Sequence, residues 1–421
     1  MFNLPAFILL VSLSIIQASF NKAFAYEELV VAASTEIDID IDRFPAKGEY
    51  LAVWLAPEYG FKEQHRHLAN LLALAGIEIW QSNIIESLFL TQNVRSLRQL
   101  DGEYIADVMQ YAHKITAKKI ILIGDSYAAI NVLTGAHKWQ QRQTTSDYLI
   151  GAVLFSPYTY ASLPQLGTPP DFMPVVSATN IPIMIYQARN SGNINQFENL
   201  ISRLQQHDAP VYTKFMPDIF SLFYHNPPTK HMLKLMDSLP GNILKMIHIL
   251  ERHAFPEKAI NFTNKVTEKS GKDIFLKKYS GKITPVPIEL QDISGTRFIK
   301  HNYKNQVTIV NFWATWCPPC VEEIPSLNRL TKKMQDTAFQ LISVNYAEDI
   351  NTVIDFMRQV NVEYPVLIDN NGHFAKQWNV VSYPSTFVID RNGKIQYGVN
   401  AAIEWDSPGV INKLKALQNL K

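Results

Sequence analysis

Short apolar runs alternate with helical patterns between residues 49 and 253. Leu68, Leu71, Leu72 and Ala75 illustrate the helical pattern, because residues three and four positions apart share one face of a helix. The apolar runs predict strands at 50–55, 77–81, 119–123, 150–155, 181–186 and 210–215. Strands that alternate with helices in this way predict a parallel sheet covered by helices on both faces.

A second α/β pattern occupies the end of the chain. Residues 256–282 are rich in Lys, Glu, Asn, Ser and Gly, which is typical of a linker. The pattern after this linker ends in a helix, with Ser407 as the N-cap and Pro408 as the first helical residue. The sequence therefore predicts two α/β domains, 26–255 and 283–421. Because the linker separates them, we expect two independent cores.

The first 25 residues have the pattern of a targeting segment. Residues 4–16 are apolar and uncharged, and Ala23-Phe24-Ala25 is a small-x-small cleavage pattern. We therefore expect a signal peptide at 1–25, with cleavage before Tyr26. The first three residues carry no Lys or Arg, so an uncleaved membrane anchor stays open as an alternative. Export would place the protein in the periplasm, where the surroundings are oxidising.

Composition excludes several classes of protein. Of the 421 residues, 47% are hydrophobic and 18% are charged, which favours buried cores over disorder. The net charge of +1 leaves no broad basic field for nucleic acid. Two cysteines are too few for a four-cysteine zinc site, and we expect no metal and no cofactor. Residues 38–49 have the acidic spacing of a calcium loop, but Arg43 stands where glycine is needed, so alternating Ile and Asp predict a strand.

The two cysteines form a Cys-Pro-Pro-Cys motif, Cys317 to Cys320, between a strand at 308–312 and a helix at 321–334. A cysteine at the start of a helix faces unpaired amides and the positive end of the helix dipole, which stabilise a thiolate. We expect Cys317 to be the more exposed and to attack disulfides, and Cys320 to resolve the mixed disulfide. The alternatives are a structural disulfide, which restrains few residues, and half of a metal site, which lacks its second ligand pair.

The surrounding sequence resembles the TlpA/ResA-like branch of the thioredoxin superfamily over residues 283–421. The segments that carry this resemblance are Asn-Phe-Trp-Ala-Thr-Trp-Cys-Pro-Pro-Cys at 311–320, Glu-Ile-Pro at 323–325, Val-Asn at 344–345 with Glu348, and Tyr-Pro-Ser-Thr-Phe-Val-Ile-Asp at 383–390. The resemblance implies a periplasmic thiol–disulfide oxidoreductase that reduces disulfides of exported proteins. A membrane electron donor would keep it reduced.

The same resemblance implies roles for two further residues. Pro384 would be a cis proline beside the cysteines that presents backbone to an extended substrate, and the alternative is a trans proline that opens an edge strand. Glu348 would act near the active site, and the alternative is a surface carboxylate that opens a helix at 349–360. Asn311 stands where cytoplasmic thioredoxins usually carry a buried Asp.

A serine motif marks the first domain. Gly124-Asp125-Ser126-Tyr127-Ala128 joins a strand to a helix and has the small residues that a nucleophile elbow needs. With a loop at 56–60 in the oxyanion position, this order resembles the α/β-hydrolase fold. The resemblance implies Ser126 as nucleophile, the Tyr127 amide as oxyanion donor and His225 as base.

The acid of this hydrolase-like site is missing from its usual place. The loop at 187–193 carries no carboxylate, and Asp218 is the only substitute nearby in the sequence. Without the acid, a catalytic His loses orientation and charge stabilisation. We therefore expect an oxidoreductase whose hydrolase-like domain binds or positions a partner. The alternative is a serine esterase or peptidase with an accessory thioredoxin-like module. The oligomeric state stays open.

Overall fold

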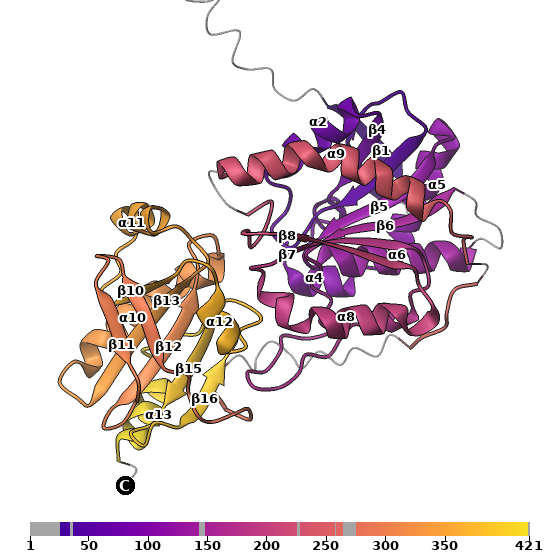
Figure 1. Ribbon diagram of the computed structural model, residues 1–421. Helices are drawn as coiled ribbons and strands as arrows, with labels where there is room; N and C mark the ends of the chain where they lie inside the picture. Colours follow the sequence, from indigo (N-terminus) through magenta and orange to yellow (C-terminus); the bar gives the residue numbers. More distant parts are fainter. Residues whose placement is uncertain are drawn as a thin grey trace, which may run out of the picture.

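The protein folds into two α/β domains, each built around its own eight-stranded sheet (Figure 1). The computed structural model describes residues 26–33, 37–142, 148–224, 228–256, 258–263 and 275–419. The predicted signal peptide lies outside these residues. Within the described part of the chain, no helix combines the length and apolarity needed to cross a membrane.

The first sheet has the strand order β1-β2-β4-β3-β5-β6-β7-β8. Its strands are β1 (Glu27–Ala32), β2 (Asp38–Phe44), β3 (Tyr50–Leu55), β4 (Ile77–Ser82), β5 (Lys119–Asp125), β6 (Leu149–Phe155), β7 (Ile183–Ala188) and β8 (Val211–Met216). The strands from β4 to β8 are parallel, and β1 and β2 join them as an antiparallel edge. All six predicted strands are present, and β2 confirms that residues 38–44 form a strand.

Helices cover both faces of this sheet, as the alternating pattern predicted. They are α2 (Glu63–Leu74), α3 (Ile84–Ser87), α4 (Val94–Gln99), α5 (Glu103–Thr116), α6 (Ala128–Arg142), α7 (Pro174–Ala178), α8 (Phe197–Leu204) and α9 (Lys230–Leu250). Successive side chains of β3 point to opposite faces: Leu51 and Val53 pack with α5, α6 and α8, whereas Trp54 packs with α2 and α9.

The second sheet has the strand order β11-β10-β14-β13-β12-β15-β16-β9. Its strands are β9 (Lys277–Lys278), β10 (Ile288–Asp292), β11 (Arg297–Lys300), β12 (Val307–Trp313), β13 (Phe339–Tyr346), β14 (Val366–Asp369), β15 (Ser385–Ile389) and β16 (Ile395–Val399). Its helices are α10 (Pro318–Met334), α11 (Ile350–Gln359), α12 (His373–Gln377) and α13 (Pro408–Gln418). Strands β12, β13 and β14 are parallel, and β15 and β16 form an antiparallel hairpin. Strand β9 shows that the end of the predicted linker joins this sheet.

Each domain keeps core clusters of its own, and the two domains also share a packed interface. Leu166 and Phe220 of the first domain belong to the same buried cluster as Phe312 of the second. The amide of Asn400 also donates a hydrogen bond of 2.6 Å to the Pro164 carbonyl. Apolar surface from both domains is therefore buried in one interface, which fixes how the two sites face each other.

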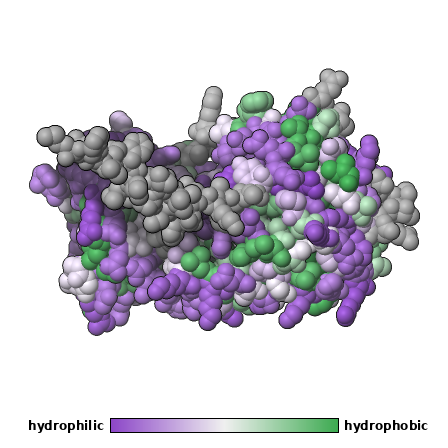
Figure 2. Space-filling model, turned by 90° about the horizontal axis from the view of Figure 1, so that it is seen from above, coloured by the Kyte–Doolittle hydropathy of each residue, from purple (hydrophilic) through white to green (hydrophobic). Residues whose placement is uncertain are grey.

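The outer surface seen from above is mainly hydrophilic, with hydrophobic residues in small separate groups among polar ones (Figure 2). Scattered exposed apolar side chains, such as Leu74 and Phe89, are ordinary on the surface of a folded protein. A large group of aromatic side chains instead lies between the two domains.

Candidate active site

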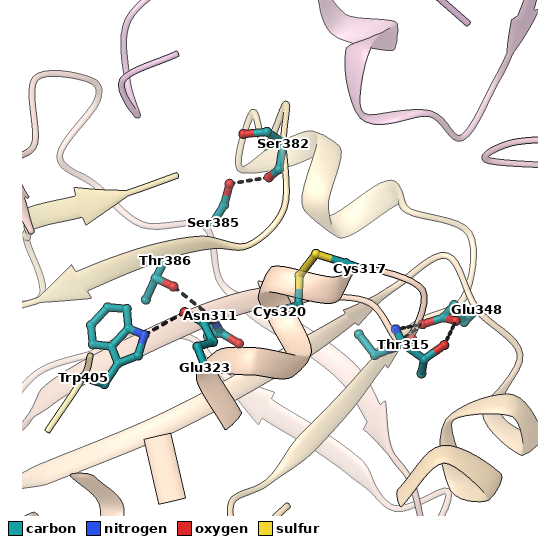
Figure 3. Close-up of a disulfide and its surroundings, with 11 residues drawn as sticks. Asn311, Thr315, Cys317, Cys320, Glu323, Glu348, Ser382, Ser385, Thr386 and Trp405 are labelled. Carbon is teal, nitrogen blue, oxygen red and sulfur yellow. Dashed lines mark hydrogen bonds between the residues drawn. A yellow bond between two sulfur atoms is a disulfide. The ribbon is translucent and has the colours of Figure 1, made fainter. Parts of the chain in front are cut away.

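The Cys317–Cys320 disulfide lies at the start of helix α10 (Figure 3). Cys317 is the N-cap residue and Pro318 is the first helical residue, where a missing N–H costs no helical hydrogen bond. Each cysteine is only 1% exposed. The expectation that Cys317 is the more exposed is therefore wrong, because the first domain covers this end of the helix.

The Glu348 carboxylate supports the loop before Cys317. It accepts hydrogen bonds of 2.8 Å from the Thr315 amide and 2.7 Å from the Asn345 side chain, and another from the Thr315 hydroxyl. Figure 3 shows Glu348 and Thr315 side by side, next to the disulfide. The side chain is 2% exposed, so the alternative of a surface carboxylate is wrong. Glu348 holds the approach to Cys317 in place.

A second buried carboxylate, Glu323, lies on the helix turn after Cys320. It accepts hydrogen bonds of 2.8 Å from the Asn311 side chain and 2.9 Å from the Trp405 indole (Figure 3). Asn311 also donates to the Thr386 hydroxyl. Burial raises the pKa of the Glu323 carboxyl to about 7. Glu323 thus places a group that can exchange protons on the same helix as the cysteines. Asn311, on strand β12, offers only a side-chain amide.

The loop before β15 carries a cis peptide bond between Tyr383 and Pro384, as the resemblance implied. The Ser385 hydroxyl closes this loop by donating a hydrogen bond to the Ser382 carbonyl. The Tyr383 ring lies 6.0 Å from the Trp316 ring and stacks on Tyr346 at 4.5 Å. The Tyr383 ring therefore joins this loop to Trp316, the residue before Cys317.

The first domain contributes the opposite wall of the site. A cavity of about 160 Å³ lies between the domains, and both Cys317 and Ser126 line it. Aromatic residues supply a large part of its other walls, with Tyr59, Tyr127, Phe155, Tyr158, Phe220, Phe223 and Tyr224 from the first domain and Trp316, Tyr346 and Tyr383 from the second. The two motifs that the sequence placed in separate domains thus line one cavity.

Ser126 lies in a strained turn between β5 and α6. Its φ of 51° is in the left-handed region, which non-glycine residues rarely adopt. Gly124 lets the helix approach, because a Cβ there would lie 2.8 Å from Val132 and 3.1 Å from the Ala128 backbone. This strand–turn–helix geometry is that of a nucleophile elbow.

The partner of Ser126 is a carboxylate that the sequence reading missed. The Ser126 hydroxyl donates a hydrogen bond of 2.7 Å to Glu58 Oε1, and the Tyr127 amide donates one of 3.3 Å to Glu58 Oε2. The predicted oxyanion donor is thus already engaged. Burial raises the pKa of the Glu58 carboxyl to about 7. The sequence held one signal for this role, because Glu58 is the charged residue of the loop that follows a buried strand.

The structure does not assemble a Ser-His-acid triad within the described residues. His225 lies outside them. Asp218 is exposed, and the loop after β7 is closed by hydrogen bonds from the Gln187 amide to Ser191 and Asn193. His65 is buried beside the serine turn, but its Nε2 lies 3.3 Å from Asp125 Oδ1, so the polar partner of this nitrogen is Asp125 and not Ser126. Among the described residues no group of three or more His, Cys, Asp or Glu side chains could hold a metal.

Comparison with known proteins places the chain among thiol–disulfide proteins. The AhpC/TSA family model matches residues 281–398. Thiol-disulfide oxidoreductase ResA from Bacillus thuringiensis subsp. konkukian is 33% identical over 104 residues, which are 25% of this chain and 60% of that protein. Its counterpart from Geobacillus kaustophilus is 30% identical over 135 residues, 32% of this chain and 74% of that protein. A solved thiol:disulfide interchange protein of the thioredoxin family from Chlorobium tepidum TLS, with 25% identity and a TM-score of 0.28, covers 32% of this chain and 98% of its own.

The sheet, the disulfide at the start of α10 and the cis-proline loop beside it define the C-terminal domain as a thioredoxin fold. Through this domain, the chain belongs to the ResA-like family of thiol-disulfide oxidoreductases. The chain spans only about 60% of the length of the first of these relatives.

Proposed function

We propose that the protein catalyses thiol–disulfide exchange through Cys317 and Cys320. The observation that carries this proposal is the Cys-Pro-Pro-Cys disulfide at the N-terminus of α10, in a chain that belongs to the ResA-like family. The helix N-terminus stabilises the Cys317 thiolate, which is the attacking species. No cofactor takes part, because sulfur itself carries the electrons.

The reaction begins with the reduced protein. The Cys317 thiolate attacks one sulfur of a substrate disulfide, a mixed disulfide forms, and the first substrate thiolate leaves and takes up a proton. Cys320 then loses its proton and attacks Cys317, which releases the second substrate thiol. Two electrons pass from the cysteines to the substrate, and an electron donor, expected in the membrane, reduces the pair again. The side chain of Glu323, one turn after Cys320, is suited to take up the Cys320 proton.

The test compares two serine variants of the full chain. Cys317→Ser should abolish exchange, because it removes the attacking sulfur. Cys320→Ser should accumulate a mixed disulfide on Cys317, which mass spectrometry of the non-reduced protein detects. A Cys320→Ser protein that forms no adduct, together with a Cys317→Ser protein that forms one, would reverse the two roles.

We further propose that the first domain is a hydrolase-like domain that shapes the redox site and turns over esters poorly or not at all. The elbow geometry of Ser126 supports the fold assignment. The Glu58 carboxylate at Ser126 and at the Tyr127 amide argues against turnover, because it fills the place of a substrate oxyanion. The alternative remains a serine esterase or peptidase, which a fluorophosphonate probe on Ser126 would reveal.

The pattern at residues 1–25 supports export to the periplasm, where oxidised thiols are available as substrates. The substrates expected from the sequence are disulfides of exported proteins. Fractionation of cells that express the full chain tests the location, and the mass of the mature protein tests cleavage before Tyr26.

A further inference from the structure

The first domain occupies the surface beside the disulfide where a large substrate would have to dock. Phe220 stacks on Trp316, the residue before Cys317, with ring centres 4.8 Å apart and an angle of 10° between the planes. Gly192 lies against the proline loop so closely that a Cβ would come within 3.3 Å of the Val381 carbonyl and 3.4 Å of the Tyr383 ring. The surfaces on two sides of Cys317 are therefore covered.

The covered arrangement is supported by polar contacts as well as by stacking. Besides the bond from Asn400 to Pro164, the Asn195 side chain donates a hydrogen bond of 3.3 Å to the Lys376 carbonyl. Leu166 packs into the core cluster of the second domain. The first domain is therefore held against the redox domain by several contacts, so its position over the disulfide does not depend on a single side chain.

What remains open at Cys317 is the aromatic cavity and a groove that adjoins it. The groove, of about 560 Å³, shares Glu58, Tyr59, Tyr224 and Trp316 with the cavity and extends to Lys62 and Pro318. The cavity itself holds about 160 Å³. A folded protein cannot enter a space of this size, whereas the half of a small disulfide can.

We propose that the substrate which reaches Cys317 in this arrangement is a low-molecular-weight disulfide with a compact apolar body and a polar end, rather than a folded protein. The inference rests on the proposed thiol–disulfide exchange and departs from the exported-protein disulfides that the sequence led us to expect as substrates. The aromatic walls bury the apolar body. The Ser126 and Glu58 side chains, on the wall across from the disulfide, offer hydrogen bonds to the polar end.

The reaction keeps the electron balance of the proposed function. The Cys317 thiolate attacks R–S–S–R inside the cavity, the first R–S⁻ leaves through the groove and is protonated, and Cys320 displaces the second R–S⁻. One disulfide becomes two thiols, and the Cys317–Cys320 disulfide forms. A dithiol reductant restores the reduced protein between turnovers.

The experiment follows a single oxidation of the pre-reduced full chain by stopped flow, with the fluorescence of tryptophans such as Trp316 as the signal. The oxidants are bis(2-hydroxyethyl) disulfide and insulin. Dithiothreitol, a free dithiol, provides the reference ratio of the two rate constants. Val94→Trp, from the cavity wall, narrows the cavity from the first domain only, and Val30→Trp, at a half-exposed position on β1, is the matched control. Leu163→Trp, also on the wall, is the second test should Val94→Trp not fold.

For the protein, we expect the ratio of the rate constant with the small disulfide to that with insulin to be at least ten times the same ratio for dithiothreitol. We expect Val94→Trp to slow the small disulfide at least tenfold and Val30→Trp to leave the rate unchanged. A preference for the small disulfide over insulin that is no greater than that of dithiothreitol, or no effect of either wall variant, would overturn the inference while leaving thiol–disulfide exchange intact. A reduced protein that neither disulfide oxidises would overturn the proposed function as well.

Discussion

The Ser126 hydroxyl donates its hydrogen bond to a buried carboxylate, Glu58, at 2.7 Å, and Glu58 also engages the neighbouring Tyr127 amide. One side chain therefore occupies both the nucleophile and the amide that would stabilise an oxyanion. This pairing explains how an elbow can persist without the rest of a hydrolase site. The turn is required by the close approach of β5 and α6, whatever chemistry follows.

We therefore expect slow or absent hydrolysis of 4-nitrophenyl acetate by the full chain. Removal of an oxyanion donor alone costs about 10²–10³ in rate in serine hydrolases, and here the Tyr127 donor is already taken. Ser126→Ala should leave the residual rate unchanged, as should Ser221→Ala, a control on the same cavity wall. Fast turnover that disappears only in Ser126→Ala would show that Glu58 moves aside or acts as a base.

The raised pKa of Glu323 predicts a pH-dependent stability. Its folded pKa of about 7 lies above the ordinary value of 4.5, so the folded protein keeps a proton that the unfolded chain releases. This contribution is fully present below pH 4.5 and is lost as pH rises through 7. The difference between the two pKa values corresponds to about 3 kcal/mol in the free energy of unfolding, since one pKa unit is ~1.4 kcal/mol.

Glu323→Gln tests this prediction, because glutamine resembles the protonated carboxyl. Between pH 5 and pH 8, the free energy of unfolding of the oxidised variant should gain up to about 3 kcal/mol relative to the natural protein. Urea denaturation at the two pH values measures the gain. Glu322→Gln, at an exposed position on the same helix, is the control and should show no such change. Parallel pH profiles for the natural protein and Glu323→Gln would contradict the assignment.

The stacking of Phe220 on Trp316 predicts that the first domain limits access to the disulfide. Phe220→Ala should raise the rate at which dithiothreitol reduces Cys317–Cys320 severalfold, because the cover over Trp316 is removed. Its cost in stability should be at most about 3–5 kcal/mol, the usual range for a buried Phe→Ala change. Phe215→Ala, which removes a ring that packs on Arg189, is the matched control. Equal reduction rates in all three proteins would show that the interface opens freely.

Much of each sheet could be predicted from the sequence because parallel strands are buried on both faces and read as continuous apolar runs. β3, with all six residues buried, is such a run. The helix after the cysteines was also predicted, although α10 begins at Pro318 and not at residue 321. β1 was missed because Glu27 and Glu28 open it and it pairs only at the edge.

Contacts between residues far apart in the sequence could not be predicted in the same way. Glu58 meets Ser126 because β3 pairs with β5 in parallel, across 68 positions of sequence. The burial of Cys317 depends on Phe220, which belongs to another domain and follows no repeating pattern. Local propensity and motif spacing report on neighbours in sequence, whereas these contacts follow from how whole layers pack.

Glu348 provides the last prediction, on how the loop before Cys317 is held. Glu348→Gln replaces an acceptor oxygen with an NH₂ group among donors from Thr315 and Asn345, which should destabilise the oxidised protein by about 1–3 kcal/mol. The displaced loop should also change the reduction potential of the Cys317–Cys320 pair, a readout that stability alone would not move. Glu289→Gln, at an exposed ion pair with Arg297, is the control and should cost no more than about 1 kcal/mol. An unchanged potential alongside the expected loss of stability would reduce Glu348 to a structural residue, because its contacts would then not reach the disulfide chemistry.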